Sequence, residues 1–328
     1  MTPPRTLATG MQLDDDMESS PLVRASAAVC VMTVLGLMVT ATSGAPRMAA
    51  EGVLDKLRAG APLRLGFRLD ARPFSYRDES GKPAGYSVTL CEKVLDALKG
   101  EPGLSGATAV WVPIPAADRF QVLERGQVDV FCGADTITPE RQNQIAFSIP
   151  IFPGGIGALI RSESSSALKD VLMGRDKTAN IASREAAIRE LQLRAFTAVT
   201  KTTSETWLKS RIKDFGTSAF VMPVETFDTG VEQLMNNKTD AFFAERAMLL
   251  DAVRRHPSAR SLAVVDRFYT QESLALSLPK GDDAWRQFAN RALGKFYASG
   301  EVSNVYSTWF GPPDGPTQAF FKANTKSE

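Results

Sequence analysis

One short stretch of the chain combines residue types that could bind an anion. In "VDVFCGADTITPERQNQIAFSIPIF", residues 128–152, an apolar run leads into two threonines, a proline and Arg141. Thr138, followed by proline, is typical of a helix N-cap, so Arg141 should lie in the first turn. A carboxylate bound there would receive backbone N–H groups, hydroxyls and a guanidinium together. The alternative is a surface arginine paired with Glu140 or Asp135.

Sequence motifs typical of catalysis and metal binding are largely missing. The single histidine, His256, would have to serve any histidine-dependent mechanism alone. The sequence has no CxxC, HExxH or GxxxxGK[ST] motif, so we expect no metal and no cofactor. "GGIGAL", residues 154–159, lacks the spacing of a dinucleotide-binding loop and indicates a flexible crossing between lobes.

Length and charge narrow the class of protein. The chain has 328 residues, which predicts one or two compact domains, and 44% of them are hydrophobic. Lys and Arg number 38 and Asp and Glu 37, so the charges nearly cancel. A nucleic-acid partner is therefore not expected, because such proteins usually carry a basic patch.

An apolar segment near the N-terminus predicts export. Residues 25–41 are uncharged, follow Arg24 and precede a run of small residues. This pattern is typical of a signal peptide, with cleavage after Ser43 and a start at Met17 that would give an ordinary length. We assign residues 1–45 to an N-terminal extension and signal peptide and expect a periplasmic protein. The alternative is an uncleaved membrane anchor.

Export would place the remaining cysteines in an oxidising compartment. Cys91 and Cys132 are then the two cysteines of the mature chain. One disulfide between them is possible. The alternative, two buried thiols, stays open because free cysteines are often buried.

Strand-like and helix-like patterns alternate along the rest of the chain. Residues 63–134 read as strand, helix, strand, helix, strand, which predicts a parallel sheet covered by helices. A second α/β series follows a serine-rich linker that ends near Ser166. The chain closes with a strand at 272–280 and two helices. In such sheets ligands bind beyond the carboxyl ends of the strands, so the stretch ending at Arg141 is a candidate site.

Five stretches of the chain carry a resemblance to a known family. They are "LRLGFRLDARPFSYRDESGKPAGYSVTLC", "VPIPAADRFQVLERGQVDVFCGADTITPERQNQIAFSIPIF", "TKTTSETWL", "VEQLMNNKTDAFFAERAMLL" and "YASGEVSNVYSTWFG". In order and spacing they resemble the extracytoplasmic solute-binding proteins of family 3, which deliver polar amino acids to ABC transporters. Within that family the resemblance is strongest to the glutamate/aspartate-binding group, and the block containing Thr136 and Arg141 is the most specific part.

The resemblance implies an α/β fold of the periplasmic-binding-protein type II, with two α/β lobes joined by two crossing strands. Residues 60–158 plus 266–311 would form lobe 1, and residues 159–265 would form lobe 2. The polar segment 312–328 would be a loose C-terminal tail.

The resemblance also assigns the anchor of the ligand. Arg141 would bind the α-carboxylate of an amino acid, with Thr136 as a hydroxyl donor and the backbone near Ala134 alongside. Thr202 and Thr203, in "TKTTSE", would face the ligand from lobe 2.

The remaining assignments concern the ammonium group and the ligand side chain. Glu245 stands where the family usually has an aspartate that binds the α-ammonium; the alternative is a solvated helix start. Phe74 would pack near the ligand or in the core. Arg68 and Arg119 match arginines that acidic-amino-acid binders direct at a side-chain carboxylate; the alternative is surface arginines. Three arginines in one cleft would suit a dicarboxylic ligand.

Several positions depart from the family pattern. Ala116 and Ala134 replace serines, Lys201 replaces a glycine, and Phe227 stands near a polar position. Glu245 is one methylene longer than aspartate. These departures leave another polar or cyclic amino acid open as the ligand.

We therefore expect a monomeric binding protein without enzymatic activity. It would capture a polar, acidic amino acid between its lobes and deliver it to the membrane subunits of an ABC transporter. One alternative is an enzyme resembling cyclohexadienyl or arogenate dehydratases, with Glu245 as general acid or base. The other is an amino-acid sensor anchored by residues 25–41.

Overall fold

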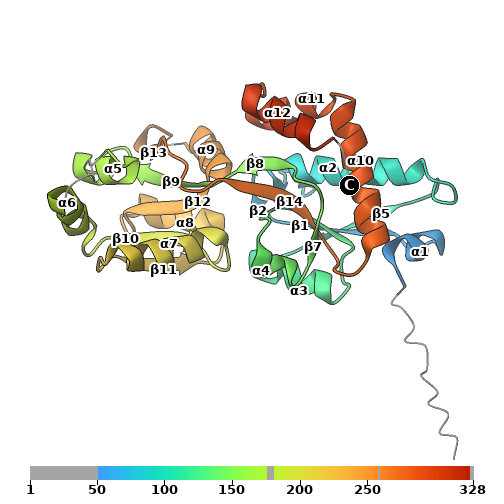
Figure 1. Cartoon of the computed structure of the whole chain (residues 1–328), viewed down its shortest axis with the longest axis horizontal. Coiled ribbons are helices and arrows are strands. Elements are labelled where there is room, and N and C mark those ends of the chain that lie inside the picture. The colour runs from blue at the N-terminus through green and yellow to red at the C-terminus, as the bar shows by residue number, and fades with distance from the viewer. Residues whose placement is uncertain (1–50, 176–180, 258, 326–328) are drawn as a thin grey trace, which may run out of the picture. The chain divides into compact units, whose positions relative to one another are not determined.

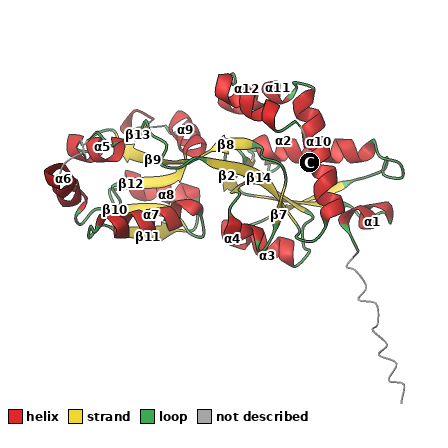
Figure 2. Cartoon of the chain, in the orientation of Figure 1, coloured by secondary structure: helices red, strands yellow, loops and turns green. Residues whose placement is uncertain are grey.

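The computed structural model describes residues 51–175, 181–257 and 259–325 (Figure 1). The signal-peptide prediction for residues 1–45 lies outside the described residues. Within the described ranges, no helix is both long and apolar enough to cross a membrane. Helices and strands alternate along the chain, as the sequence pattern predicts (Figure 2).

The first main sheet has the strand order β5-β1-β6-β14-β7, and β8 also pairs with β14. β1 pairs in parallel with both β5 and β6, which confirms the predicted parallel arrangement, whereas β14 runs antiparallel to β6. A small sheet of β2, β3 and β4 follows β1. The bounds are β1 Leu63–Phe67, β2 Asp70–Ala71, β3 Ser75–Arg77, β4 Pro83–Ala84, β5 Ala109–Pro113, β6 Val130–Thr136, β7 Ala146–Phe147, β8 Phe152–Gly154 and β14 Glu272–Leu278.

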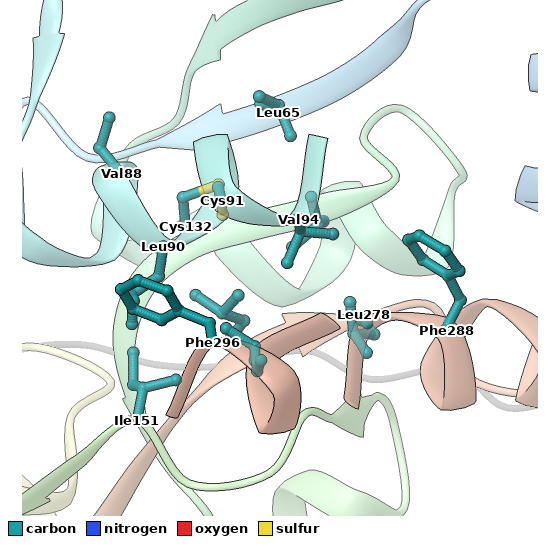
Figure 3. Close-up of a cluster of buried hydrophobic side chains, with 14 of the residues drawn as sticks. Leu65, Val88, Leu90, Cys91, Val94, Cys132, Ile151, Leu278, Phe288 and Phe296 are labelled. Atoms are coloured by element: carbon teal, nitrogen blue, oxygen red, sulfur yellow. A yellow bond between two sulfur atoms is a disulfide. The ribbon is translucent and has the colours of Figure 1, made fainter. Parts of the chain in front are cut away.

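Alternating side chains give this sheet two buried faces. Val130 and Cys132 belong to the core that contains α2 and α10, whereas Phe131 belongs to a second core with α3. This alternation is expected because successive side chains of a strand point to opposite faces. Figure 3 shows part of the larger core. The helices of this half are α1 Val53–Arg58, α2 Tyr86–Lys99, α3 Arg119–Glu124, α4 Pro139–Gln142, α10 Asp283–Ala298, α11 Val302–Phe310 and α12 Gly315–Ala323.

The second main sheet has the order β11-β10-β12-β9-β13. β10 pairs in parallel with β11 and β12, and β9 runs antiparallel to β12 and β13. One face packs on α5, α6 and α7, and the other on α8 and α9. The bounds are β9 Ile156–Arg161, α5 Ser166–Met173, α6 Ile181–Leu191, β10 Ala195–Val199, α7 Thr203–Phe215, β11 Phe220–Val224, α8 Phe227–Met235, β12 Ala241–Glu245, α9 Arg246–Arg255 and β13 Leu262–Val264.

The chain passes between the two sheets twice. Gly155 joins β8 to β9, and residues 265–271 join β13 to β14. The two passages touch: the Ile156 N–H donates to the Thr270 hydroxyl at 2.9 Å. A Cβ atom at Gly155 would lie 2.2 Å from the Thr270 carbonyl oxygen, so only glycine allows this close approach.

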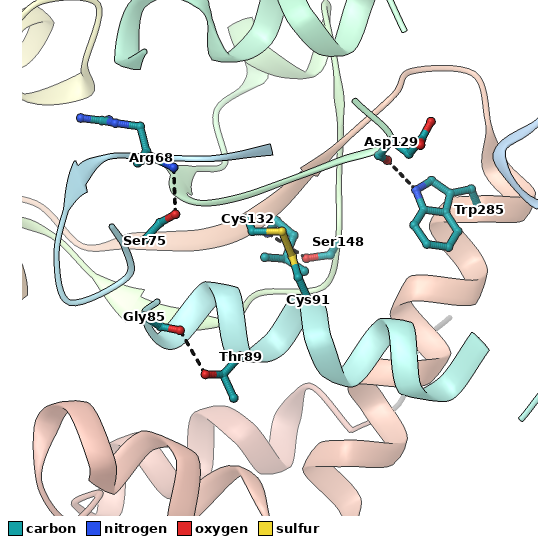
Figure 4. Close-up of a disulfide and its surroundings, with 10 residues drawn as sticks. Arg68, Ser75, Gly85, Thr89, Cys91, Asp129, Cys132, Ser148 and Trp285 are labelled. Carbon is teal, nitrogen blue, oxygen red and sulfur yellow. Dashed lines mark hydrogen bonds between the residues drawn. A yellow bond between two sulfur atoms is a disulfide. The ribbon is translucent and has the colours of Figure 1, made fainter. Parts of the chain in front are cut away.

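Cys91 of α2 and Cys132 of β6 form a disulfide, so the disulfide, and not the alternative of two buried thiols, is the correct interpretation (Figure 4). Their Cα atoms lie 6.1 Å apart, within the usual range for a disulfide. Both residues are fully buried in the core between α2 and the first sheet. The bond therefore ties helix α2 to the middle of the strand that ends at Thr136.

The expectation of a loose tail over residues 312–328 is wrong for its described part. Helix α12 occupies Gly315–Ala323, and the Asp314 carboxylate caps it by accepting the Thr317 N–H at 2.9 Å. Phe321 is buried against Tyr297 and Tyr306. Mostly polar residues surround Phe320 and Phe321, and the core contacts of these two rings come from residues distant in the sequence, so the local pattern did not predict this helix.

Candidate ligand-binding cleft

Each main sheet contains a point where the connections leave in opposite directions. β1 lies between β5 and β6, and β10 lies between β11 and β12, with all the pairs parallel. Ligands of open α/β sheets bind at the carboxyl ends of such strands. Arg68 directly follows β1, Thr136 ends β6, Thr203 lies shortly after β10 and Glu245 ends β12.

Residues from both sheets line one small cavity of about 80 Å³. Its size suits a small polar molecule, since the pockets for drug-sized ligands are several times larger. Eight of the nine predicted ligand-binding residues are among those that line it: Arg68, Arg119, Ala134, Thr136, Arg141, Thr202, Thr203 and Glu245.

Arg141 lies in the first turn of α4, as predicted. The Thr138 hydroxyl caps this helix by accepting the Arg141 N–H at 3.2 Å. The guanidinium donates to the Thr136 carbonyl at 2.9 Å and lies over the Phe120 ring. In the described part of the chain, no carboxylate forms an ion pair with it. Loss of water lowers its pKa below the usual value, yet an arginine stays protonated at neutral pH.

Arg119 is buried, not on the surface. Its Nε donates to Asp135 at 2.7 Å, and one Nη donates to the Ala116 carbonyl. The other Nη donates across the cleft to the Lys201 carbonyl at 3.0 Å. Asp135 is held in turn by the Ser277 hydroxyl at 2.8 Å. Arg119 therefore forms a buried ion pair and also links the two lobes.

Arg68 is also buried and paired. Its Nε and one Nη donate to Asp70 at 2.8 and 2.5 Å, and its backbone N–H donates to the Ser75 hydroxyl (Figure 4). The other oxygen of Asp70 accepts the Phe227 N–H from the second lobe at 3.1 Å. An aspartate thus offsets this guanidinium, as Asp135 offsets that of Arg119. Of the three cleft arginines, Arg141 is the one that forms no ion pair within the described residues.

The two threonines of the second lobe have different contacts. The Thr202 hydroxyl is the N-cap of α7: it accepts the Glu205 N–H at 3.3 Å and donates to the Val199 carbonyl at 2.6 Å. The Thr203 hydroxyl lies 3.4 Å from the Thr136 hydroxyl of the first lobe. Thr203 is therefore the threonine whose side chain meets the opposite lobe.

Glu245 ends β12 and caps α9. One carboxyl oxygen accepts the Gly155 N–H at 2.8 Å, and the other accepts the Ala247 N–H at 3.2 Å. Burial raises the pKa of this carboxyl to about 8, although the backbone hydrogen bonds act in the opposite direction. At neutral pH the side chain is therefore mostly uncharged.

Comparison with known proteins decides the family. Residues 63–312 match the model of the bacterial extracellular solute-binding proteins, family 3. The chain belongs to this family.

Curated relatives of this solute-binding protein include binders of acidic amino acids. It is 29% identical to the L-glutamate/L-aspartate-binding protein of Pseudomonas aeruginosa over 85% of this chain and 87% of that one. It is 25% identical to the glutamate/aspartate import solute-binding protein of Salmonella typhimurium, over 87% and 88% of the two chains.

A solved structure supports the fold. An ancestral amino acid-binding protein, described as a precursor of cyclohexadienyl dehydratase, has a TM-score of 0.63 and 22% identity, covering 79% of this chain and 99% of that one. The predicted fold class, two α/β lobes of the periplasmic-binding-protein type II, is confirmed.

One predicted contact of this solute-binding protein is not in the cleft. Phe74 is fully buried and does not line the cavity. Its ring packs against Phe152 and Phe310, with centroids 4.9 and 5.4 Å away. The core alternative is therefore the correct one, because Phe74 points into the aromatic core of the first lobe.

Lys201, where the family pattern has glycine, adopts a left-handed backbone with φ of 58°. Residues other than glycine are disfavoured in this backbone conformation. Its N–H donates to Glu205 at 2.8 Å and its carbonyl accepts from Arg119. These two hydrogen bonds hold the strained residue at the edge of the cleft.

Glu272 is a charged residue of the cleft that the sequence pattern did not predict. It is the first residue of β14 and lines the cavity. One oxygen accepts hydroxyls from Thr136 at 2.5 Å and Thr203 at 3.2 Å, and the other accepts that of Thr270 at 2.9 Å. Its position at the start of a strand that returns from the second lobe was the available signal.

Proposed function

We propose that this solute-binding protein captures a polar, acidic amino acid, such as glutamate or aspartate, between its two lobes. It delivers the ligand to the membrane subunits of an ABC transporter. It acts in the periplasm as a monomer, without a nucleic-acid partner and without catalysing a reaction.

The guanidinium of Arg141 carries this proposal. It lines the cavity and has no carboxylate partner among the described residues, so its charge is available to a ligand. Burial disfavours this charge, and the carboxylates of Asp135 and Glu272 offset that only through space; a bound α-carboxylate would add a direct ionic partner. Thr136 and Thr203 bring hydroxyls to the same cavity from opposite lobes.

Arg68 supports an acidic side chain on the ligand. Asp70 occupies only part of its guanidinium, because two of its three nitrogens donate to one carboxylate oxygen. The third nitrogen remains for a carboxylate of the ligand. The relative from Pseudomonas aeruginosa is named for glutamate and aspartate, which agrees with this choice.

Delivery follows from family membership and from the two lobes. A ligand that contacts both lobes stabilises the arrangement in which they meet, so it shifts the population toward that form. Arg119 and Asp70 already contribute hydrogen bonds between the lobes. The transporter would recognise this form.

Thermal unfolding of ligand-free protein against the twenty L-amino acids tests the proposal. A ligand present at about 100 times its Kd adds about 2.7 kcal/mol of stability, which raises the Tm by roughly 4–5 °C for a chain of this size. We expect the largest rise with L-glutamate or L-aspartate. A Tm unchanged by every amino acid would exclude the function.

Glu245 favours one second candidate, an enzyme of the dehydratase type. A cleft carboxyl with a pKa of about 8 is protonated at neutral pH and could act as a general acid. Turnover of prephenate or arogenate, lost in Glu245→Gln, would support this candidate. Binding of an amino acid without turnover of either compound would exclude it.

A further inference from the structure

Among the described residues, the hydrogen bonds to the Glu272 carboxylate come from hydroxyl groups. Its carboxylate accepts hydrogen bonds from Thr136, Thr203 and Thr270, which come from the first lobe, the second lobe and the passage between them. In the described ranges no lysine or arginine forms an ion pair with it. Hydroxyls stabilise a carboxylate without cancelling its charge, so Glu272 presents a negative charge to the cavity that it lines.

The other charged groups of the cleft are already matched. Arg68 is paired with Asp70, and Arg119 is paired with Asp135. Glu245 differs from Glu272, because backbone N–H groups occupy both its oxygens and its raised pKa leaves it mostly uncharged. Among the described residues that line this cavity, Arg141 is therefore the cation and Glu272 the anion that form no direct ion pair, although the charge of Glu272 acts on Arg141 through space.

These two groups both contact one residue. The Arg141 guanidinium donates to the Thr136 carbonyl at 2.9 Å, and the Thr136 hydroxyl donates to Glu272 at 2.5 Å. An amino acid carries its carboxylate and its ammonium on the same carbon atom. A cation and an anion that both contact Thr136 have the signs that such a zwitterion requires.

We propose that Glu272 supplies the negative charge opposite the ammonium group of the ligand, while Arg141 faces its carboxylate. This inference rests on the proposed function. Glu245 then contacts the ammonium as an uncharged neighbour. The role gives the protein a way to distinguish an α-amino acid from a dicarboxylic acid without the amino group.

The test compares two ligands in two matched variants. Glu272→Gln and Glu245→Gln each keep the shape of the side chain and remove the ability to carry a charge. Calorimetric titration uses L-glutamate and glutarate, which differ by the amino group. If another amino acid gives the largest thermal shift, that amino acid and its deaminated analogue replace them.

We expect Glu272→Gln to weaken the binding of L-glutamate by about 30-fold or more, because removing one partner of a desolvated charge pair is costly. Glutarate should bind this variant as well as, or better than, it binds the wild type, since a repelling charge is gone. Glu245→Gln should weaken L-glutamate less than Glu272→Gln does.

A structural role for Glu272 would give a different pattern. Thr203→Val removes one of the hydrogen bonds between the lobes and keeps the Glu272 charge, so it should weaken the binding of both ligands by a similar, smaller factor. Equal weakening of both ligands by Glu272→Gln would overturn the inference, as would unchanged binding of L-glutamate or a larger loss in Glu245→Gln. If no amino acid binds the wild type, the proposed function fails and the inference fails with it; if one binds, only the inference is at stake.

Discussion

At the scale of single residues, the contacts of each cleft arginine decide its role. Arg141 has no carboxylate partner in the described chain, whereas Arg68 and Arg119 are each paired with an aspartate. A paired guanidinium contributes directed hydrogen bonds more than net charge. Arg141 should therefore set whether any amino acid binds, and Arg68 should set which one.

Arg68→Ala should change ligand preference. We expect the affinity of the variant for L-glutamate to fall roughly tenfold or more, and its affinity for L-glutamine to fall less, because only L-glutamate has a side-chain carboxylate. Calorimetric titration of both ligands measures the ratio. Asp70→Asn is the matched control: it breaks the same ion pair but keeps the guanidinium, so it should retain or tighten L-glutamate binding. Equal losses for both ligands in Arg68→Ala would contradict this role.

Glu245 should make stability depend on pH. Its pKa of about 8 in the folded protein exceeds the ordinary value of 4.5. Between these values the unfolded chain releases the proton and the folded protein keeps it, so this residue destabilises the fold increasingly as pH rises. At pH 8 the cost is on the order of 4 kcal/mol, and below pH 4.5 it disappears.

The difference between wild type and Glu245→Gln isolates this effect, because other titrating groups cancel. Urea unfolding at pH 5, 6.5 and 8 should show the variant gaining stability over the wild type as pH rises. A difference that is independent of pH would show that Glu245 titrates normally in the folded protein.

At the scale of elements, strand β6 combines support and function. Cys132, in its middle, is joined to helix α2, and Ala134 and Thr136, at its carboxyl end, line the cavity. The strand pairs with β1 on one edge and β14 on the other, and the disulfide also fixes it to helix α2 on one face of the sheet. A rigid strand of this kind positions ligand contacts more precisely than a free loop does.

Removing the disulfide should destabilise the protein without changing which ligand it prefers. The bond spans 41 residues of sequence, for which chain-entropy reasoning gives about 4 kcal/mol. Denaturant unfolding of Cys91→Ala/Cys132→Ala against the oxidised wild type measures the loss. Alanine keeps the buried site apolar. A change below about 1 kcal/mol would show that the bond contributes little to the fold.

At the scale of the whole molecule, local sequence signals predicted the elements well and the long-range pairings poorly. The helix start at Thr138 is a local pattern, and the structure has it. Arg119 of α3 pairs with Asp135 of β6, and Glu272 bonds to Thr136 from 136 residues away. Neither pairing follows from spacing, because each depends on how strands are ordered in the folded sheet.

The same distinction explains the cleft residues. Family resemblance placed eight residues at one cavity because strand ends carry them. It did not show that two arginines are offset by aspartates, nor that Phe74 points into the core. Side-chain direction and ionic partners are properties of the assembled lobes.

Calorimetric titration of L-glutamate into ligand-free wild type and Arg141→Ala tests amino-acid capture by this cleft most directly. We predict one binding site per wild-type chain and no measurable binding to the variant, since Arg141 holds the one guanidinium of the cavity without a carboxylate partner in the described chain. L-aspartate and the neutral amino acids should likewise show no measurable binding to the variant. Binding of any amino acid to folded Arg141→Ala with wild-type affinity would contradict the assignment of this cleft.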